Sequence, residues 1–265
     1  DVITVEIPAI PEEFEVMKKK IVEMQKAGIH HLNLHQLRLT PHNLPHVNQR
    51  GYTFLHGERV TVLESELTAL RLIRWAQEEG IPLPINYCSF VYKNRFQRAA
   101  ARRKSAEFIR KPHEDITGNG YIRTLEITGA PDALNRIING WKAEGKEECL
   151  WALSPNKDRL QVSFSLWHTP ELESFPMRVG YTEAKILPAL TGRNLFVQLP
   201  LNPQRHLFVE KVPAHDKIDL RPELFDRLRS IENGKDTDIN SLADDPDWES
   251  VRTFETIESG LAEYF

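Results

Sequence analysis

The chain has 265 residues, of which 40% are hydrophobic and 27% charged, and a formal net charge of −4. This length and composition are typical of one large or two smaller globular domains. The net charge gives no reason to expect a nucleic-acid partner. The sequence has no apolar run near the ~18 residues of a membrane helix and no signal peptide, so we expect a cytoplasmic protein without a membrane partner. Its two cysteines, Cys88 and Cys149, form neither a disulfide framework nor the spacing of a zinc site.

The first third of the chain alternates predicted strands and helices. Apolar, β-rich runs predict strands at residues 2–7, 29–34 and 81–86. A helix is expected after each of them, and the third should cover residues 95–111. The apolar face of the second helix is predicted from the helical spacing of Leu63, Leu67, Leu70 and Ile73. This order of elements predicts a parallel sheet with helical crossovers.

The pattern changes after residue 113. Strands are expected at residues 121–127, 148–153, 159–166, 177–186, 195–199 and 206–212, and helices at 131–143 and 223–231. Residues 155–158 (PNKD) predict a hairpin turn. We therefore expect residues 115–231 to form an α+β domain with a mostly antiparallel sheet. The acidic tail, residues 232–265, is expected to be partly disordered, with one docking helix that carries Trp248, Val251, Phe254 and Ile257.

Polar side chains gather near the ends of the predicted parallel strands. The carboxyl ends of such strands open onto the active face of α/β proteins. Asn33 and His35 have the same parity on one strand, and Asn86 and Cys88 on another, so each pair shares a face. Glu6 on the first strand would be their neighbour. We expect these five residues to line one site.

Several residues have both a functional and a structural interpretation. Cys88 lies near Lys93, whose charge would favour a nucleophilic thiolate, but a buried structural cysteine is the commoner outcome. Six histidines occur within residues 30–56, yet they lack metal-site spacing, and His30 and His31 point to opposite faces of a strand. We therefore predict no metal site. Residues 38–60 form a long connection of the kind that often carries function.

The basic run at residues 93–111 also has two interpretations. It could bind phosphates or RNA. It could instead be a solvated helix face that contacts the acidic tail, and we favour this second interpretation because phenylalanines and alanines give the run an apolar side.

Short segments of the first third resemble the second half of a radical SAM protein. They are residues 32–37 (LNLHQL), 50–52 (RGY), 86–89 (NYCS), 96–97 (FQ) and 102–103 (RR), together with Lys93. The resemblance is to the group related to pyruvate formate-lyase activating enzyme, and it covers about residues 1–111. It implies half of a partial (βα)6 barrel at residues 1–114, followed by the α+β accessory domain and the acidic tail.

The resemblance also implies S-adenosylmethionine, a [4Fe–4S] cluster and a 5′-deoxyadenosyl radical that abstracts hydrogen from a substrate. Combined with the rule for strand ends, it makes Glu6, Asn33 and Asn86 candidate cofactor-binding residues. His35 and Cys88 become candidate catalytic donors of a proton or hydrogen atom.

The sequence departs from the family pattern at one point. It has no CxxxCxxC loop, and Cys88 and Cys149 cannot replace three clustered thiolates. Either an N-terminal half has been removed or left out, or the chain is a degenerate relative of the family, and the start at Asp1 favours removal. We then expect neither cofactor to bind stably to this chain alone, and either the missing half or a self-associating sheet edge as its partner.

Two other functions stay open. The antiparallel domain could be a non-enzymatic regulatory module that binds a small molecule or a protein. Alternatively, Cys88 and His35 could serve a hydrolase or transferase. A CxxxCxxC motif upstream in the coding sequence would favour the radical enzyme, whose substrate the sequence does not identify.

Overall fold

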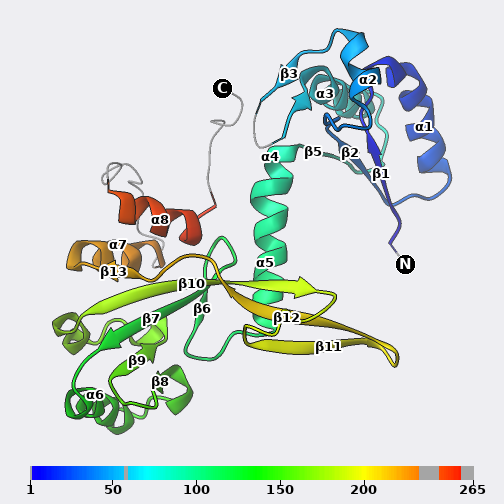
Figure 1. The fold of residues 1–265 in the computed structure, drawn as a ribbon. Coiled ribbons are helices and arrows are strands. Elements are labelled where there is room, and N and C mark those ends of the chain that lie inside the picture. Colours follow the sequence, from blue (N-terminus) through cyan, green and yellow to red (C-terminus); the bar gives the residue numbers. More distant parts are fainter. Residues whose placement is uncertain (1, 57–58, 233–244, 258–265) are drawn as a thin grey trace. The chain divides into compact units, whose positions relative to one another are not determined.

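The structure, a computed structural model, describes residues 2–56, 59–232 and 245–257. The chain forms two compact units, which divide between Gln97 and Arg98 (Figure 1). The sequence placed this boundary near residue 114. Helix α5 (Arg98–Glu107) belongs to the second unit because Ala106 packs in a core cluster with residues of that unit's sheet.

The first unit is built on three parallel strands. They are β1 (Thr4–Pro8), β2 (His31–His35) and β5 (Ile85–Cys88), in the order β1-β2-β5. The pairing confirms the predicted parallel arrangement. After the 3-10 turn η1 (Pro11–Glu13), α1 (Phe14–Lys26) connects the first two strands, and α3 (Leu63–Glu78) precedes the third.

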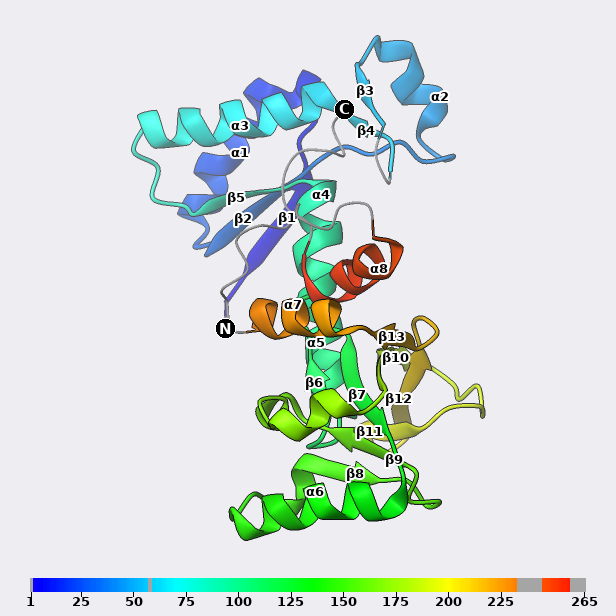
Figure 2. The same cartoon turned by 90° about the vertical axis from the view of Figure 1, so that its left-hand side faces the viewer.

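The two long helices of this unit lie on one face of the sheet (Figure 2). Leu32 and Leu34 of β2 point toward them and are fully buried with Ile21 of α1 and Leu72 of α3. Because side chains alternate along a strand, Asn33 and His35 point to the opposite face. The apolar core therefore fixes which face carries the polar residues.

Helix α3 packs with a different face from the one predicted. Leu67 and Leu70 are about half exposed, whereas α3 buries Ser65, Thr68, Ala69, Leu72 and Ala76. The Ser65 hydroxyl donates to the Ala9 carbonyl at 2.6 Å and accepts from the Leu37 N–H at 2.8 Å. These bonds turn the face with small residues toward the sheet, where a close approach needs short side chains.

The connection between β2 and α3 is ordered by short elements. They are α2 (Leu44–Val47), η2 (Asn48–Arg50), β3 (Phe54–Leu55) and β4 (Thr61–Val62). The Glu12 carboxylate accepts from Arg50 at 2.9 Å and from the Tyr52 hydroxyl, and Gly51 adopts a left-handed conformation with φ 66°. The connection is thus attached to the start of α1.

The third predicted helix begins earlier than expected and changes its winding. It starts with α4 (Phe90–Tyr92), where the Ser89 hydroxyl accepts from the Tyr92 N–H at 3.0 Å. A π-helical turn, η3 (Lys93–Gln97), follows and leads into α5. Such turns are rare and frequently occur at functional sites.

The second unit contains a sheet whose pairings are all antiparallel. Its main order is β11-β12-β10-β7-β9-β8, while β13 pairs with β10 and β6 with β7. The strands are β6 (Asp115–Ile116), β7 (Ile122–Thr128), β8 (Trp151–Leu153), β9 (Arg159–Val162), β10 (Met177–Leu187), β11 (Phe196–Asn202), β12 (Arg205–Pro213) and β13 (Ile218–Leu220). The antiparallel arrangement and the hairpin turn at residues 155–158 were predicted and are confirmed.

Helices cover both faces of this sheet. The main core contains residues of α6 (Pro131–Ala143), α7 (Pro222–Glu232) and α8 (Pro246–Glu255), all packed on one face. Helix α5 packs on the other face through Ala106. Three short 3-10 turns complete the unit: η4 (Glu148–Leu150), η5 (Phe164–Leu166) and η6 (Pro170–Ser174).

The predicted docking helix of the tail is confirmed as α8. It buries Trp248, Val251 and Phe254 in the core of the second unit. The predicted disorder falls on residues 233–244 and 258–265, which lie outside the described residues.

The basic face of α5 binds a turn of the chain. Arg102 donates to the Asn119 carbonyl at 2.8 Å and Arg103 to the Gly118 carbonyl at 2.7 Å. The Asn119 amide in turn donates to the Thr253 carbonyl of α8 at 2.7 Å. These two arginines therefore reach the tail helix through this turn, and a direct contact of the basic run with the acidic tail stays a prediction. No helix in the described part of the chain is long and apolar enough to cross a membrane.

Candidate functional site

A row of polar side chains crosses the sheet of the first unit. Glu6, Asn33 and Asn86 are direct neighbours on β1, β2 and β5. The Asn86 amide donates to the Asn33 side-chain oxygen at 3.1 Å, and the Asn33 amide donates to the Glu6 carboxylate at 3.4 Å. Both amides therefore direct their N–H groups toward the carboxylate. We call these three residues, together with His35, the polar row.

His35 completes the row at the carboxylate. Its Nε2 atom lies 3.1 Å from a Glu6 oxygen. The bond from His35, then the bond from Asn33, hold the pKa of Glu6 below its usual value, and the charge of Lys93 acts in the same direction. The Glu6 side chain is 59% exposed, so the ionised carboxylate is open to a ligand.

Cys88 lies beside His35 on the same face, but in different surroundings. The two residues are partners in the pairing of β2 and β5. The Cys88 thiol is buried and contacts the Gln97 amide at 3.5 Å and the Ser89 carbonyl at 3.8 Å. Burial raises the pKa of Cys88, and this effect exceeds the opposing effect of Lys93. Lys93 thus favours the thiolate as expected, but burial outweighs its charge, because loss of solvation disfavours the charged form.

The face that carries the polar row is accessible in the first unit. An open pocket of about 320 Å³ lies beside part of the row, lined by Asn33, Asn86, His31 and Thr4 among others, whereas Glu6 and His35 of the row are not among its lining residues. The carboxylate, amide oxygens and imidazole there can bind hydroxyl and amino groups of a polar ligand. The helices α1 and α3 do not interfere, since they pack on the other face.

A second group of polar residues at the strand ends was missed by the sequence analysis. The Gln36 side-chain oxygen accepts from the Phe90 N–H at 3.1 Å, and its amide donates to Glu66 at 3.4 Å. Burial raises the pKa of Glu66. Gln36 could have been found from its place after a strand, but Glu66 lies on a helix whose packing face was assigned incorrectly.

The residues of the chain do not fit an iron–sulfur cluster. Such a cluster needs several clustered thiolates, whereas Cys88 belongs to the first unit and Cys149 to the second. Within the described ranges no three His, Cys, Asp or Glu side chains are grouped so that they could hold a metal ion. His30 of the histidine cluster instead accepts from the Ile3 N–H at 3.0 Å.

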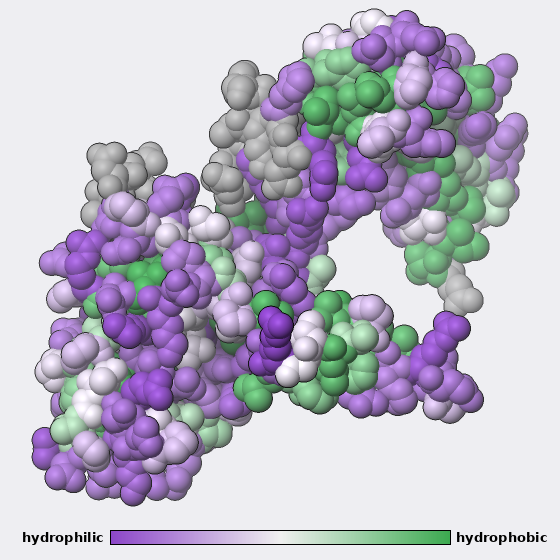
Figure 3. All heavy atoms as spheres, viewed as in Figure 1, coloured by the Kyte–Doolittle hydropathy of each residue, from purple (hydrophilic) through white to green (hydrophobic). Residues whose placement is uncertain are grey.

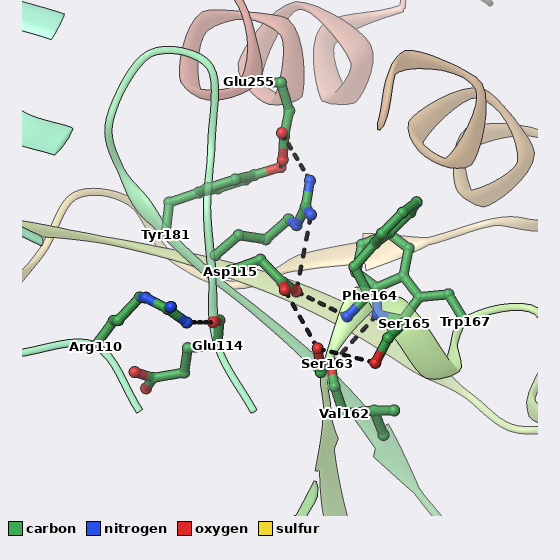
Figure 4. Close-up of polar contacts among 11 residues, drawn as sticks. Arg110, Glu114, Asp115, Val162, Ser163, Phe164, Ser165, Trp167, Tyr181 and Glu255 are labelled. Atoms are coloured by element: carbon green, nitrogen blue, oxygen red, sulfur yellow. Dashed lines mark hydrogen bonds and ion pairs between the residues drawn. The ribbon is translucent and has the colours of Figure 1, made fainter. Parts of the chain in front are cut away.

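A different polar cluster lies inside the second unit. Arg123 of β7 is fully buried and donates to the Glu255 carboxylate of α8 at 2.8 Å. The Tyr181 hydroxyl donates to the other Glu255 oxygen at 2.7 Å, and the two side chains point toward each other (Figure 4). The Arg123 guanidinium also lies over the Trp167 ring at 4.6 Å. We call Arg123, Tyr181 and Glu255 the buried cluster.

Asp115 extends this cluster toward a neighbouring loop. One of its oxygens lies 3.8 Å from Arg123 and accepts from the Phe164 N–H at 2.9 Å, and the other accepts from Ser163 at 3.3 Å (Figure 4). A charged side chain that is shielded from water is stable only when other groups supply its hydrogen bonds and an opposite charge. The buried cluster therefore attaches α8 to the sheet.

One comparison with known proteins supports a relationship to radical SAM proteins. A protein of Methanocaldococcus jannaschii, described as a candidate glycyl-radical enzyme activating enzyme, is 31% identical to this chain over 137 residues. The match covers 50% of this chain and 35% of that relative. No family model and no solved structure matches the chain. The narrower resemblance to the pyruvate formate-lyase activating enzyme group stays a prediction.

Proposed function

We propose that this chain is the part of a radical SAM protein that faces S-adenosylmethionine and substrate. The relationship to the archaeal relative supports this assignment. The observation that carries it is the polar row, which lies on the open face of a parallel sheet. The side chains of the row bond to one another on a sheet face that no described helix of the unit's core covers, so they remain within reach of a polar ligand.

The donor set of the polar row fits a ligand rich in amino and hydroxyl groups. Glu6 would accept from such groups, while Asn33 and Asn86 would bind them through their amides. S-adenosylmethionine, when bound, would supply the 5′-deoxyadenosyl radical. His35 would hold a proton next to the carboxylate, and the shielded Cys88 would be a candidate hydrogen-atom donor, because that role needs a thiol and no thiolate.

Other residues would have to hold the iron–sulfur cluster. The chain contains two cysteines in all, one in each unit. We propose that a segment outside this chain supplies the clustered thiolates and that the half-barrel face completes a cavity with it. Chemical analysis of this chain, reconstituted without oxygen, should then find no stoichiometric iron and sulfide.

The test uses the whole protein that contains this chain, purified without oxygen and reduced. Glu6→Gln and Asn33→Ala should lower both the binding of S-adenosylmethionine and its cleavage to 5′-deoxyadenosine by at least about tenfold. Glu15→Gln is the matched control, because Glu15 is an exposed carboxylate on α1 of the same unit. Unchanged binding and cleavage in both row variants would contradict the proposal.

The poor fit to a cluster favours one alternative, a module that binds a polar ligand without catalysis. In that case the chain alone should bind ligand at the polar row, and Glu6→Gln should weaken binding with no cleavage in any preparation. The hydrolase or transferase is less favoured, because His35 bonds to Glu6 while the Cys88 thiol is buried with a raised pKa.

A further inference from the structure

Strand β11 forms one edge of the large sheet in the second unit. It pairs with β12 on one side, and no strand in the described part of the chain pairs with its other side. Apolar side chains gather on the surface over this hairpin (Figure 3). Leu195, Phe196 and Leu201 are 63%, 47% and 59% exposed. Exposed edges of this kind are normally protected by charged side chains.

The backbone of β11 presents hydrogen-bonding groups along this free edge. The Leu195 carbonyl accepts from the Lys211 N–H of β12 at 2.8 Å. The backbone groups of Leu195 are therefore directed toward β12 and not toward the free edge. In antiparallel pairing the direction alternates, which turns the backbone groups of Phe196, Gln198 and Pro200 outward. The alternation is regular as far as Pro200, and the register against β12 shifts between Pro200 and Asn202, so Leu201 lies at an irregularity of the edge. Pro200 has no backbone N–H, so it cannot donate a hydrogen bond at this edge. Strands tolerate proline at such edges because no neighbouring strand there requires the donor.

The sequence of this edge is nearly the same in both directions. Residues 194–202 read NLFVQLPLN and contain no charged residue. Counted outward from Gln198, Val197 corresponds to Leu199, Leu195 to Leu201, and asparagine stands at both ends. Phe196 corresponds to Pro200, and both residues are apolar. A strand that pairs antiparallel with its own copy around a two-fold axis needs this symmetry, because each residue meets its counterpart.

We propose that the chain forms a homodimer through antiparallel pairing of β11 with β11 of a second copy, with the two-fold axis at Gln198. Gln198 exchanges both backbone hydrogen bonds with its copy. The Phe196 N–H donates to the Pro200 carbonyl of the second copy. Leu195 lies opposite Leu201 at both ends, so the most exposed leucines of the edge leave water together.

The proposal is independent of the proposed function, since all of these residues belong to the second unit. Its first test is sedimentation equilibrium of the full chain over a range of concentrations. We expect a reversible monomer–dimer equilibrium with a Kd on the order of 10 μM, as for a small interface. A monomer at every concentration would overturn the proposal and would indicate that Pro200 protects the edge.

Charge substitutions test the register. Leu195→Lys and Leu201→Glu should each raise the dimer Kd by at least about tenfold, because each buries an unpaired charge at both ends of the interface. The double variant places lysine opposite glutamate twice and should restore the dimer, now with a dependence on salt. Leu67→Lys is the matched control, since Leu67 is 50% exposed in the first unit.

Two results would contradict this arrangement. If Leu195→Lys leaves the dimer Kd unchanged, the dimer forms through another surface. A double variant as weak as the single variants would show that Leu195 and Leu201 do not meet. Circular dichroism and tryptophan fluorescence check that each variant is folded.

Discussion

The polar row of the first unit and the buried cluster of the second unit use similar residues in opposite surroundings. In the row, the Glu6 side chain is 59% exposed and bonds to His35 and Asn33. In the buried cluster, Glu255 and Arg123 are almost inaccessible and satisfy each other. Both groups contain a carboxylate with two side-chain donors, but one can reach a ligand and the other cannot.

This difference shows how a structural polar group can be separated from a candidate binding site. The buried cluster connects elements far apart in sequence, β7 and α8, and its charges would be costly without one another. The row lies on neighbouring strands whose packing already depends on the apolar side chains of the other face. Removing a charge should therefore lower the stability of the second unit strongly and that of the first unit only slightly.

The largest expected effect is that of Glu255→Ala on stability. Loss of the carboxylate leaves the Arg123 charge buried, which should lower the free energy of unfolding of the second unit by about 3–5 kcal/mol. Urea unfolding followed by tryptophan fluorescence measures it, because four of the five tryptophans lie in that unit. A loss below about 1 kcal/mol would mean that water reaches Arg123, and the contrast with the row would fail.

The second largest effect is expected in the reactivity of the two thiols. Cys88 is buried and Cys149 exposed, so a thiol reagent at neutral pH should modify Cys88 at least about a hundredfold more slowly. Mass spectrometry of the native chain, with the unfolded chain as control, distinguishes the two sites. Rapid modification of Cys88 would revive the interpretation of that residue as a nucleophile.

His113 should add a pH dependence to the second unit. Burial lowers its pKa from 6.5, with Lys111 and Lys211 acting in the same direction and Glu114 and Gln161 opposing them. The unfolded chain therefore binds this proton more readily, and stability should fall by up to about 1.4 kcal/mol per pH unit as the pH drops below about 6.5. Urea unfolding between about pH 8 and pH 5.5 measures the slope, which His113→Gln should reduce.

The smallest effect is expected for Glu6→Gln. This residue is largely exposed, so its loss of charge should change the free energy of unfolding of the first unit by less than about 1 kcal/mol. Hydrogen exchange of the amides in β1, β2 and β5 reports on that unit. A loss above about 2 kcal/mol would make the polar row a structural element like the buried cluster.

Patterns of local sequence predicted most of the elements. Alternation and helical spacing gave the three parallel strands, the antiparallel second region and helix α6 with its bounds. The parity of Asn33 with His35, and of Asn86 with Cys88, is a local property as well, and it places these side chains on one face. What local patterns did not give is the face on which α3 packs. In α3 the leucines predicted that face incorrectly, because the hydroxyl of Ser65 found backbone partners 28 and 56 residues away.

The sequence by itself determined the strands of the first unit, their parallel order and the polar character of one sheet face. These follow from short-range periodicity, which the chain carries wherever it folds. Only the tertiary structure decided that Glu6, Asn33 and Asn86 form a directed row, that burial raises the pKa of Cys88, and that Arg123 meets Glu255 across 132 residues. Hydrogen bonding and desolvation depend on which distant groups exclude water from a side chain, and no local pattern contains that information.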